Sequence, residues 1–411
     1  MKSTLITVDE AEARLAGFQD VFPVEDVPLA QAGGRILRTA IRADREYPAL
    51  DRSRMDGIAV AFAAWEMGVR DYPVGGMARA GDPRGRLDDA AGCVEIMTGA
   101  PCPEGADTVI PYEALMTREF GNAREGQTRV ASVQDDATVA QGQFLHRQGS
   151  DCAQGEILVE AGVSLNAPRI AVAASMGYAR LEVTRRPRIA IVATGDELVS
   201  VDEVPLPHQI RGSNGHALRA LFEQMGTVSL QSVGDTRSVM MERLRESLAA
   251  CDVLLVTGGV SAGKFDEVPG VLKELGVEEV FHKVAQKPGK PLWFGRGPEG
   301  QLVFGLPGNP VSALVCARRY VVPLLHTKSG KTAGSTPKPA KRVGYSGALP
   351  APSNLTQFVP VRLVESVAIP CVVNGSGDFS GLGRSDGFVE IPAQKSSLPA
   401  GELLSFFGWE T

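Results

Sequence analysis

The clearest pattern of apolar and polar positions lies in the middle of the chain. Residues 188–194 (RIAIVAT) form a continuous apolar run, which is typical of a strand buried on both faces. Residues 213–226 then place apolar side chains on one face of a helix, and strand and helix patterns alternate up to residue 327. This alternation predicts a mostly parallel α/β sheet over residues 187–327.

Three helix starts carry capping signals. Thr7 is followed three residues later by a glutamate, which predicts a capping box for a short N-terminal helix. Ser213 or Asn214 suits the N-cap of the helix that follows the first buried strand. Asn309 suits an N-cap before Pro310, because proline is favoured at the first helical position. The two later helices are therefore expected to begin at glycine-rich loops.

The rest of the chain shows short strands interrupted by proline and glycine. Residues 43–141 lack helical periodicity and predict a β-rich lid domain. Residues 1–42 together with 142–186 predict the N-terminal helix and an extended linker domain. Residues 328–411 begin with a polar, linker-like stretch and then show only short strands, which fits a small β-barrel or sandwich. The expected fold is multidomain, with a central α/β domain and β-rich domains around it.

Composition narrows the classes of partner. The 411 residues suffice for about three domains. A net charge of −6 and a pI near 5.6 argue against broad binding to nucleic acid or to an anionic membrane. Six scattered cysteines without a C-x-x-C pair, and the lack of a signal-peptide or membrane-spanning pattern, indicate a cytoplasmic protein. Any anionic ligand is therefore expected to be small and held by a local cluster of residues.

Candidate chemistry is concentrated in four loops at predicted strand ends. They are residues 194–198 (TGDEL), 257–266 (TGGVSAGKFD), 286–291 (QKPGKP) and 306–310 (LPGNP). Ligands of open parallel sheets bind outside the carboxyl ends of the strands. Glycine-rich loops that lead into helices expose backbone N–H groups to an anion. Any one of these loops is equally well explained as a tight turn, but four on the same edge predict a ligand site.

The second loop departs from a phosphate-binding loop at one decisive position. Residues 258–264 match the spacing G-x-x-x-x-G-K after a predicted strand. The next residue is Phe265, where such loops carry the Ser or Thr that binds Mg²⁺. The sequence therefore disfavours an NTPase, and Asp266 is a candidate oxygen ligand for Mg²⁺ instead.

Lysines and carboxylates predict an oxyanion next to a metal ion. Lys287 and Lys290 flank a Pro-Gly turn, and the compact lysine ammonium suits phosphate-like oxyanions. The carboxylates at or near strand ends are Asp196, Glu197, Asp235 and Asp266. Carboxylates beside lysines in one crevice favour a divalent cation that bridges an anionic substrate. A helix cap is the alternative role for Asp235, and the five histidines show no ligand spacing.

Seven segments together resemble the MoeA family, the molybdopterin molybdenumtransferases, which share their architecture with the gephyrin E domain. The segments are SRMDGIAV (53–60), EIMTGAPCPEGADTVIPYE (95–113), RPRIAIVATGDEL (186–198), QIRGSN (209–214), TGGVSAGKFD (257–266), QKPGKP (286–291) and LPGNPVSA (306–313). Each is short, but their order and separation over nearly the full length make the resemblance specific.

The resemblance implies an elongated homodimer of four regions whose α/β domain is similar to the MogA-type adenylyltransferases. It implies that adenylylated molybdopterin and molybdate react in the presence of Mg²⁺, that AMP is released, and that molybdenum remains on the dithiolene. Asp235 and Asp266 would be the metal-binding carboxylates, and Asp56 would reach the active site of the other subunit.

The resemblance also implies a set of site residues. The catalytic residues would be Asp56, Glu197, Asp235 and Asp266. The substrate-binding residues would be Thr194, Asp196, Ser213, Asn214, Gly258, Gly259, Ser261, Lys287, Lys290, Pro307, Asn309 and Ser312. Within this set, Lys287, Lys290 and Ser312 would contact molybdate or phosphate, and Asp196 and Glu197 would line the pterin or nucleotide pocket.

The chain departs from the family pattern in two places. Family members carry an arginine pair in a G-R-x-x-F-x-R stretch of the last domain, where this chain has Leu355 and Pro360. Arg362 and Arg384 are the candidate substitutes. In a second family segment, an arginine and an acidic residue are replaced by His146 and Ser150. We therefore expect the molybdate site, rather than the reaction class, to differ from that of the family.

Three other functions stay open from the sequence. An adenylyltransferase that acts on molybdopterin itself has the same α/β fold, although the additional regions argue against it. A gephyrin-like non-catalytic scaffold is disfavoured by the retained lysines and carboxylates, and a pyrophosphatase with the same α/β domain is the third alternative. The sequence also leaves open the preference for molybdate or tungstate, and a protein partner such as a MogA-type adenylyltransferase.

Overall fold

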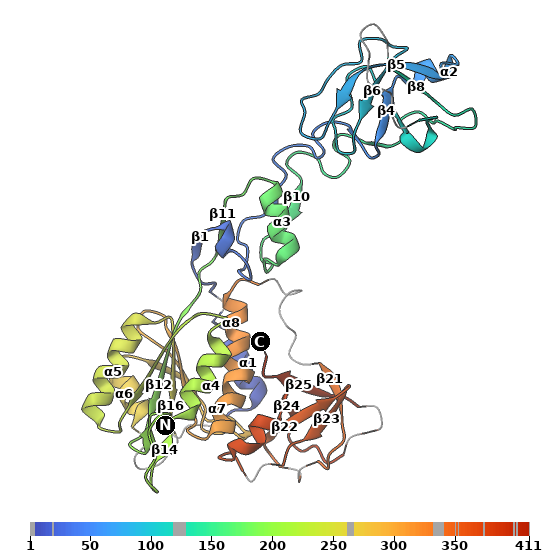
Figure 1. Ribbon diagram of the computed structural model, residues 1–411. Helices are drawn as coiled ribbons and strands as arrows, with labels where there is room; N and C mark the ends of the chain where they lie inside the picture. The colour runs from blue at the N-terminus through green and yellow to red at the C-terminus, as the bar shows by residue number, and fades with distance from the viewer. Residues whose placement is uncertain are drawn as a thin grey trace.

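The molecule is elongated, with a β-rich domain at one end, a narrow middle segment, and an α/β sheet beside a small barrel at the other end (Figure 1). The computed structural model describes residues 5–410 apart from 19, 118–128, 261–266, 332–340, 350, 352, 373–374, 398 and 400–401. Within the described residues, no helix is long and apolar enough to cross a membrane.

The central sheet has six strands in the order β15-β12-β16-β20-β19-β17. Their bounds are β15 Thr227–Val233, β12 Arg188–Thr194, β16 Val253–Thr257, β20 Leu302–Leu306, β19 Trp293–Arg296 and β17 Glu278–His282. The first four strands are parallel, whereas β19 pairs antiparallel with both β20 and β17. The sheet is therefore mixed. Strands β19 and β20 are antiparallel because the short turn between them leaves no room for the crossover that parallel strands need.

Alternating side chains of the central strands face two helical layers. The helices are α4 (Ser213–Phe222), α5 (Arg237–Ala250), α6 (Val268–Glu274), α7 (Pro310–Cys316), the π-helical η3 (Ala317–Val321) and α8 (Val322–Lys328). In β12, Ile189 and Ile191 share a core with α4, α7, η3 and α8. Ala190 and Val192 share the other core with α5 and α6. The continuous apolar run is thus explained by burial on both faces.

The N-terminal helix α1 (Val8–Leu15) begins with the predicted capping box at Thr7. It packs in the core of the α/β sheet through Val8 and Leu15, and Ile6 forms a bridge with Val284. The division of the chain at residue 42 does not anticipate this packing, because the helix is separated in sequence from the sheet that it covers.

Five C-terminal strands close into a barrel. They are β21 (Arg342–Tyr345), β22 (Thr356–Val364), β23 (Val367–Pro370), β24 (Gly387–Ile391) and β25 (Leu404–Gly408), and the pairing of β22 with β24 completes the ring. The structure thus confirms a barrel rather than a sandwich, with the short helix η4 (Phe379–Arg384) added to it. The two-residue strand β18 (Gln286–Lys287) pairs parallel with β22 and joins the barrel to the α/β part.

The middle segment is crossed twice by the chain. Its elements are β1 (Val24–Pro28), η1 (Leu29–Gln31), β2 (Ile41–Arg42), β10 (Ile157–Val159), α3 (Ala167–Ser175) and β11 (Arg180–Thr184). Strand β1 pairs with β11, and β2 pairs with β10, so each two-stranded sheet combines the outgoing and the returning chain. Figure 1 shows this segment between the β-rich domain and the α/β part.

The remote domain is built on a five-stranded sheet in the order β7-β4-β6-β5-β8. Its elements are β3 (Arg52–Ser53), β4 (Gly57–Val60), α2 (Phe62–Glu66), β5 (Asp71–Ala78), β6 (Cys93–Ile96), β7 (Thr108–Pro111), η2 (Tyr112–Ala114), β8 (Val130–Ser132) and β9 (Leu145–His146). A β-rich domain at this place agrees with the absence of helical periodicity in its sequence.

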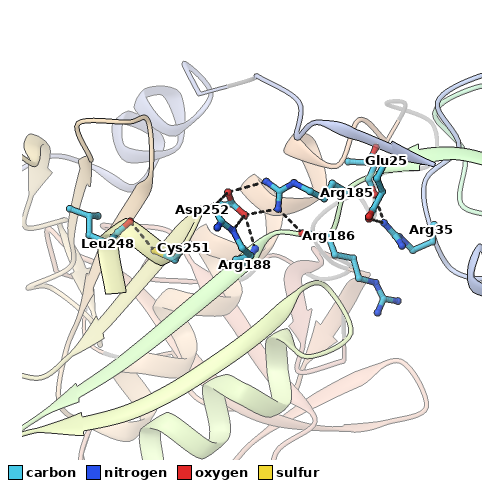
Figure 2. A network of polar contacts seen from close by, with 9 residues as sticks. Glu25, Arg35, Arg185, Arg186, Arg188, Leu248, Cys251 and Asp252 are labelled. Atoms are coloured by element: carbon cyan, nitrogen blue, oxygen red, sulfur yellow. Dashed lines mark hydrogen bonds and ion pairs between the residues drawn. The ribbon is translucent and has the colours of Figure 1, made fainter. Parts of the chain in front are cut away.

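A cluster of ion pairs fixes the joint between the middle segment and the central sheet (Figure 2). The Asp252 carboxylate accepts two hydrogen bonds from the Arg185 guanidinium (2.9 and 3.0 Å) and one from the Arg188 backbone N–H (2.7 Å). Burial raises the pKa of Asp252, but its hydrogen bonds with Arg185 and Arg188 outweigh this effect and lower the pKa to about 2. Nearby in the same view, Arg35 pairs with Glu25 across the middle segment.

Candidate functional site

A cavity of about 1230 Å³ lies at the carboxyl ends of β12, β16 and β20. The strand-end loops and the start of α4 line it on the α/β side, and the loops of the barrel line it on another side. The predicted residues that line it are Thr194, Glu197, Ser213, Asn214, Asp235, Gly258, Gly259, Lys287, Lys290, Pro307, Asn309 and Ser312. The structure therefore brings together most of the side chains that the sequence placed at one sheet edge.

Close backbone approach explains the glycines that follow β16. The Thr194 hydroxyl donates to the Thr257 carbonyl (3.5 Å), which joins the ends of β12 and β16. Gly258 has φ +97°, and a Cβ there would lie 2.5 Å from the Thr194 carbonyl oxygen. Gly259 has φ +60°. Only glycine fits both positions without strain, so this loop can pass close to the neighbouring strand at the floor of the cavity.

Asn214 connects three walls of the cavity. The expected cap at Ser213 or Asn214 is wrong, because α4 begins at Ser213 and Gly212 occupies the N-cap position without a side-chain hydrogen bond. The Asn214 amide instead donates to the Thr257 hydroxyl (3.1 Å) and to the Gly308 carbonyl (2.6 Å). This amide therefore ties the start of α4 to the loops that follow β16 and β20.

Asp196 and Asp235, at the ends of β12 and β15, connect the two loops through reciprocal hydrogen bonds. The Asp235 backbone N–H donates to Asp196 (2.9 Å), and the Asp196 backbone N–H donates to Asp235 (3.3 Å). Asp235 and Glu197 line the cavity, whereas Asp196 supports Asp235 from outside the lining. Among the described residues there is no group of three or more His, Cys, Asp or Glu side chains that would form a complete metal cage.

The two lysines are presented by a rigid turn. Lys287 and Lys290 are exposed and line the cavity, and the peptide bond between Lys287 and Pro288 is cis. Gln286, which the sequence analysis missed, is fully buried and donates to the Gly289 carbonyl (3.1 Å). The Gln286 side chain also accepts a hydrogen bond from the Tyr320 hydroxyl. A buried amide thus fixes the backbone of the turn, and this turn presents both lysines at the cavity.

The loop after β20 joins the cavity to the barrel. Asn309 occupies the predicted N-cap position of α7, but its side chain donates to the Ser376 hydroxyl (2.8 Å) instead of capping the helix. Ser312 lies in the first turn of α7, is 3% exposed, and lines the cavity. Ser376 gave no signal in the sequence, because its role depends on how the barrel docks against α7.

Opposite charges line different parts of the cavity. Glu197 and Asp235 follow β12 and β15, whereas the lysine turn lies next to β22 of the barrel. A ligand that offers oxygens to a cation in one part and carries an oxyanion in another would contact both kinds of charge.

Within the described residues, the barrel wall supplies no arginine in place of the two missing ones. Leu355 lines the cavity, whereas Pro360 is buried within β22. Arg362 and Arg384 are exposed and do not line the cavity. Within the described part of the chain, Arg211 on β14 (Ile210–Arg211), which pairs with β13 (Leu198–Val199), is the one arginine of the lining.

Asp56 lies in the remote domain and not in the cavity of its own chain. It directly precedes β4, which Figure 1 places at the far end of the molecule from the α/β sheet. Its carboxylate accepts hydrogen bonds from the Thr98 backbone N–H (2.6 Å) and hydroxyl (2.7 Å), and these bonds lower its pKa. In the same part of the molecule, His146 contacts Asp151 (2.7 Å).

Two predicted site residues, Ser261 and Asp266, lie outside the described residues. The fold and the cavity, with the predicted site residues that are described, define a class of ligand-binding protein. An open α/β sheet with glycine loops, carboxylates and lysines at its carboxyl edge is the arrangement of proteins that bind small phosphorylated or nucleotide-like ligands.

Comparison with known proteins identifies the family. The chain matches the models "MoeA N-terminal region (domain I and II)" over residues 6–177, "Probable molybdopterin binding domain" over 190–327 and "MoeA C-terminal region (domain IV)" over 342–407. It is 36% identical over 384 residues to a molybdopterin molybdenumtransferase of Synechocystis, covering 92% of this chain and 93% of that protein. The chain belongs to the MoeA family.

Other relatives agree over the full length. A molybdopterin molybdenumtransferase of Bacillus subtilis is 30% identical over 418 residues, covering 98% of this chain and 94% of that protein. Among solved structures, the molybdopterin biosynthesis MoeA protein of Pyrococcus horikosii superimposes with a TM-score of 0.85 at 28% identity. That superposition covers 99% of this chain and 100% of the other.

Proposed function

We propose that this chain is a molybdopterin molybdenumtransferase of molybdenum cofactor biosynthesis. It transfers molybdenum from molybdate to the dithiolene of adenylylated molybdopterin and releases AMP. The observation that carries this proposal is the cavity at the carboxyl edge, where glycine loops, carboxylates and the lysine turn meet in a chain of the MoeA family.

Each wall of the cavity has a role in this reaction. The glycine loops after β12 and β16 bring backbone groups close to a phosphate-bearing ligand. Lys287 and Lys290 attract an oxyanion, because each is a compact positive charge exposed to the cavity. Ser312 lines the same cavity and adds a hydroxyl-bearing side chain to it. The chain would therefore hold the adenylylated molybdopterin and the molybdate in the same crevice, and proximity favours the transfer of molybdenum to the dithiolene of that ligand.

Mg²⁺ fits the acidic part of the cavity. Asp235 and Glu197 offer carboxylate oxygens there, and Mg²⁺ binds through one or two carboxylates together with substrate phosphates. When bound, the ion neutralises negative charge that develops on the phosphate of AMP. Asp196 holds the Asp235 loop in place through their paired hydrogen bonds.

A homodimer completes the site in this proposal. Asp56 is preorganised by Thr98 but lies at the other end of the molecule from its own cavity. A second copy, related by a twofold axis, brings the Asp56 of each chain to the cavity of the other.

The proposal is tested by mixing the protein with adenylylated molybdopterin, molybdate and Mg²⁺ and by following AMP release. We expect AMP release that depends on molybdate. Reactions without molybdate, and reactions with free molybdopterin and ATP, are the controls. Consumption of ATP with free molybdopterin indicates the adenylyltransferase alternative, and the absence of molybdate-dependent AMP release refutes the proposal.

A further inference from the structure

An exposed aromatic ring lies where the barrel meets the cavity. Phe379 lines the cavity and is 70% exposed. Covering an exposed phenyl ring with another apolar surface removes both from water, and this lowers the free energy. Among the described residues that line the cavity, Phe379 is the only aromatic one. The ring is therefore the natural contact for a flat, apolar part of a ligand.

The backbone that carries this ring is fixed on both sides. Phe379 is the first residue of η4, and the Asp378 side chain caps this helix by accepting from the Ser380 backbone N–H (3.0 Å) and hydroxyl (2.6 Å). On the other side, Ser376 accepts the hydrogen bond from Asn309 and also one from a backbone N–H in the first turn of α7 (3.3 Å). The backbone at Phe379 is thus held in place relative to the loop that follows β20.

The chemistry of the barrel wall differs from that of the α/β wall. The α/β wall supplies the carboxylates, the lysine turn and the glycine loops, which suit metal ions, phosphates and oxyanions. The barrel wall supplies the apolar side chains of Leu355 and Phe379. A ligand with charged groups and a flat ring would satisfy both walls, and neither wall alone would bind both parts.

We infer that Phe379 stacks on a planar heteroaromatic ring of the ligand and is a substrate-binding residue of this site. The inference rests on the proposed function, whose substrate carries two such rings, the adenine and the pterin. Stacking of a base on an aromatic side chain accounts for about a tenfold gain in affinity or more.

Direct binding measurements test the inference without the full reaction. Isothermal titration calorimetry is performed with AMP, 6-hydroxymethylpterin and ribose 5-phosphate on the wild type and on Phe379→Ala and Phe379→Tyr. Val372→Ala is the matched control, because Val372 is also on the barrel and 86% exposed but does not line the cavity. We expect Phe379→Ala to weaken at least one ring-bearing probe about tenfold, and ribose 5-phosphate to bind as before.

The pattern over the probes identifies the ring. A loss for AMP alone assigns Phe379 to adenine, and a loss for the pterin alone assigns it to the pterin. In either case Phe379→Tyr retains binding and Val372→Ala has no effect. Equal losses for ribose 5-phosphate and the ring-bearing probes would show a general disturbance of the cavity and overturn the inference.

Two further outcomes also overturn it. One is that Phe379→Ala binds both ring-bearing probes as the wild type does. This outcome overturns the inference also when light scattering shows a changed oligomer, because Phe379 would then be an interface residue. The other is a wild type that binds neither ring-bearing probe. Molybdate-dependent AMP release by the wild type tests the proposed function separately. Ring binding that depends on Phe379 without AMP release would therefore refute the reaction and leave the stacking contact intact.

Discussion

The two ends of the central strands carry charge in different ways. At the amino end, Asp252 precedes β16 and is paired with Arg185 and Arg188 at the joint with the middle segment (Figure 2). At the carboxyl end, no ion pair within the described part of the chain joins Glu197 or Lys290 to another side chain. Paired charges hold the joint together, and exposed charges at the cavity remain available to a ligand.

The difference follows from burial. The Asp252 side chain is 17% exposed, and a carboxylate that is largely removed from water is stable only when it is paired. The charged side chains of the cavity are exposed, so water stabilises them until a ligand replaces it. Substitutions at the carboxyl end should therefore change the reaction without changing stability, and substitutions at the amino end should do the reverse.

The largest effect is expected for residues that two chains contribute to one site. Asp56→Ala and Lys290→Ala should each abolish molybdate-dependent AMP release when tested alone. After random exchange of subunits, a mixture should recover about a quarter of the wild-type activity, because half of the dimers are mixed and each has one intact site. Lys290→Ala should melt at the wild-type temperature, because its side chain is exposed. Asp56→Ala should melt slightly lower, because it loses the hydrogen bonds that its carboxylate accepts from Thr98.

The control for this experiment is a mixture of Lys290→Ala with the double variant Asp56→Ala, Lys290→Ala. In that mixture no site is intact, so no activity should return. Absence of recovery in verified mixed dimers of the two single variants, or a monomer mass in light scattering, would contradict the shared site.

A smaller effect is expected for Asp235→Asn. Asparagine keeps the oxygen that accepts from the Asp196 backbone N–H but removes one charge from the acidic part of the cavity. We expect AMP release to fall about tenfold to a hundredfold and the Mg²⁺ concentration at half-maximal rate to rise, while the melting temperature stays the same. Glu223→Gln, just after α4 and outside the cavity lining, is the matched control. Wild-type rates at every Mg²⁺ concentration would leave Asp235 with a purely structural role.

Leu355→Arg is expected to strengthen the binding of molybdate rather than weaken it. Leu355 lines the cavity where the family pattern has an arginine, and a guanidinium there would add a charge-assisted hydrogen bond to an oxyanion. The molybdate concentration at half-maximal AMP release should fall about tenfold. Pro360→Arg is not an equivalent test, because Pro360 is buried in β22. An unchanged or higher requirement for molybdate would mean that another group already fills this role.

The sequence predicted the α/β wall of the site because strand ends and glycine loops are local signals. Gly258 and the lysine turn follow directly from spacing along the chain, and a parallel sheet brings the strand ends to one edge. The same reasoning failed for Asn214, because a polar residue at a helix start has more than one set of partners. Local propensity alone does not distinguish a cap from a contact between loops.

The contacts that dock the barrel against the α/β part were not predictable in this way. Gln286 and Ser376 acquire their roles only when β18 pairs with β22 and η4 docks against α7. Such contacts join segments far apart in the chain and leave no periodicity in the sequence. The packing of α1 on the central sheet was missed for the same reason, although its capping box was predicted. Long-range docking therefore determines the part of the site that sequence patterns do not indicate.

The smallest effect on the reaction is expected at the amino end of the strands. Asp252→Asn should leave AMP release unchanged but lower the free energy of unfolding by about 2 kcal/mol, since the pKa of Asp252 is lowered from 3.8 to about 2. A folded-state pKa below the unfolded value stabilises the protein above about pH 4, and this contribution is lost as the pH falls toward 2. Denaturant unfolding of the wild type and Asp252→Asn should therefore differ at pH 7 and converge as the pH approaches 2.

Glu223→Gln, which replaces an exposed side chain, is the control and should unfold as the wild type does at either pH. A stability difference that stays constant with pH would mean that Asp252 acts through packing rather than through its charge, and a loss of AMP release would break the separation between the two ends of the sheet.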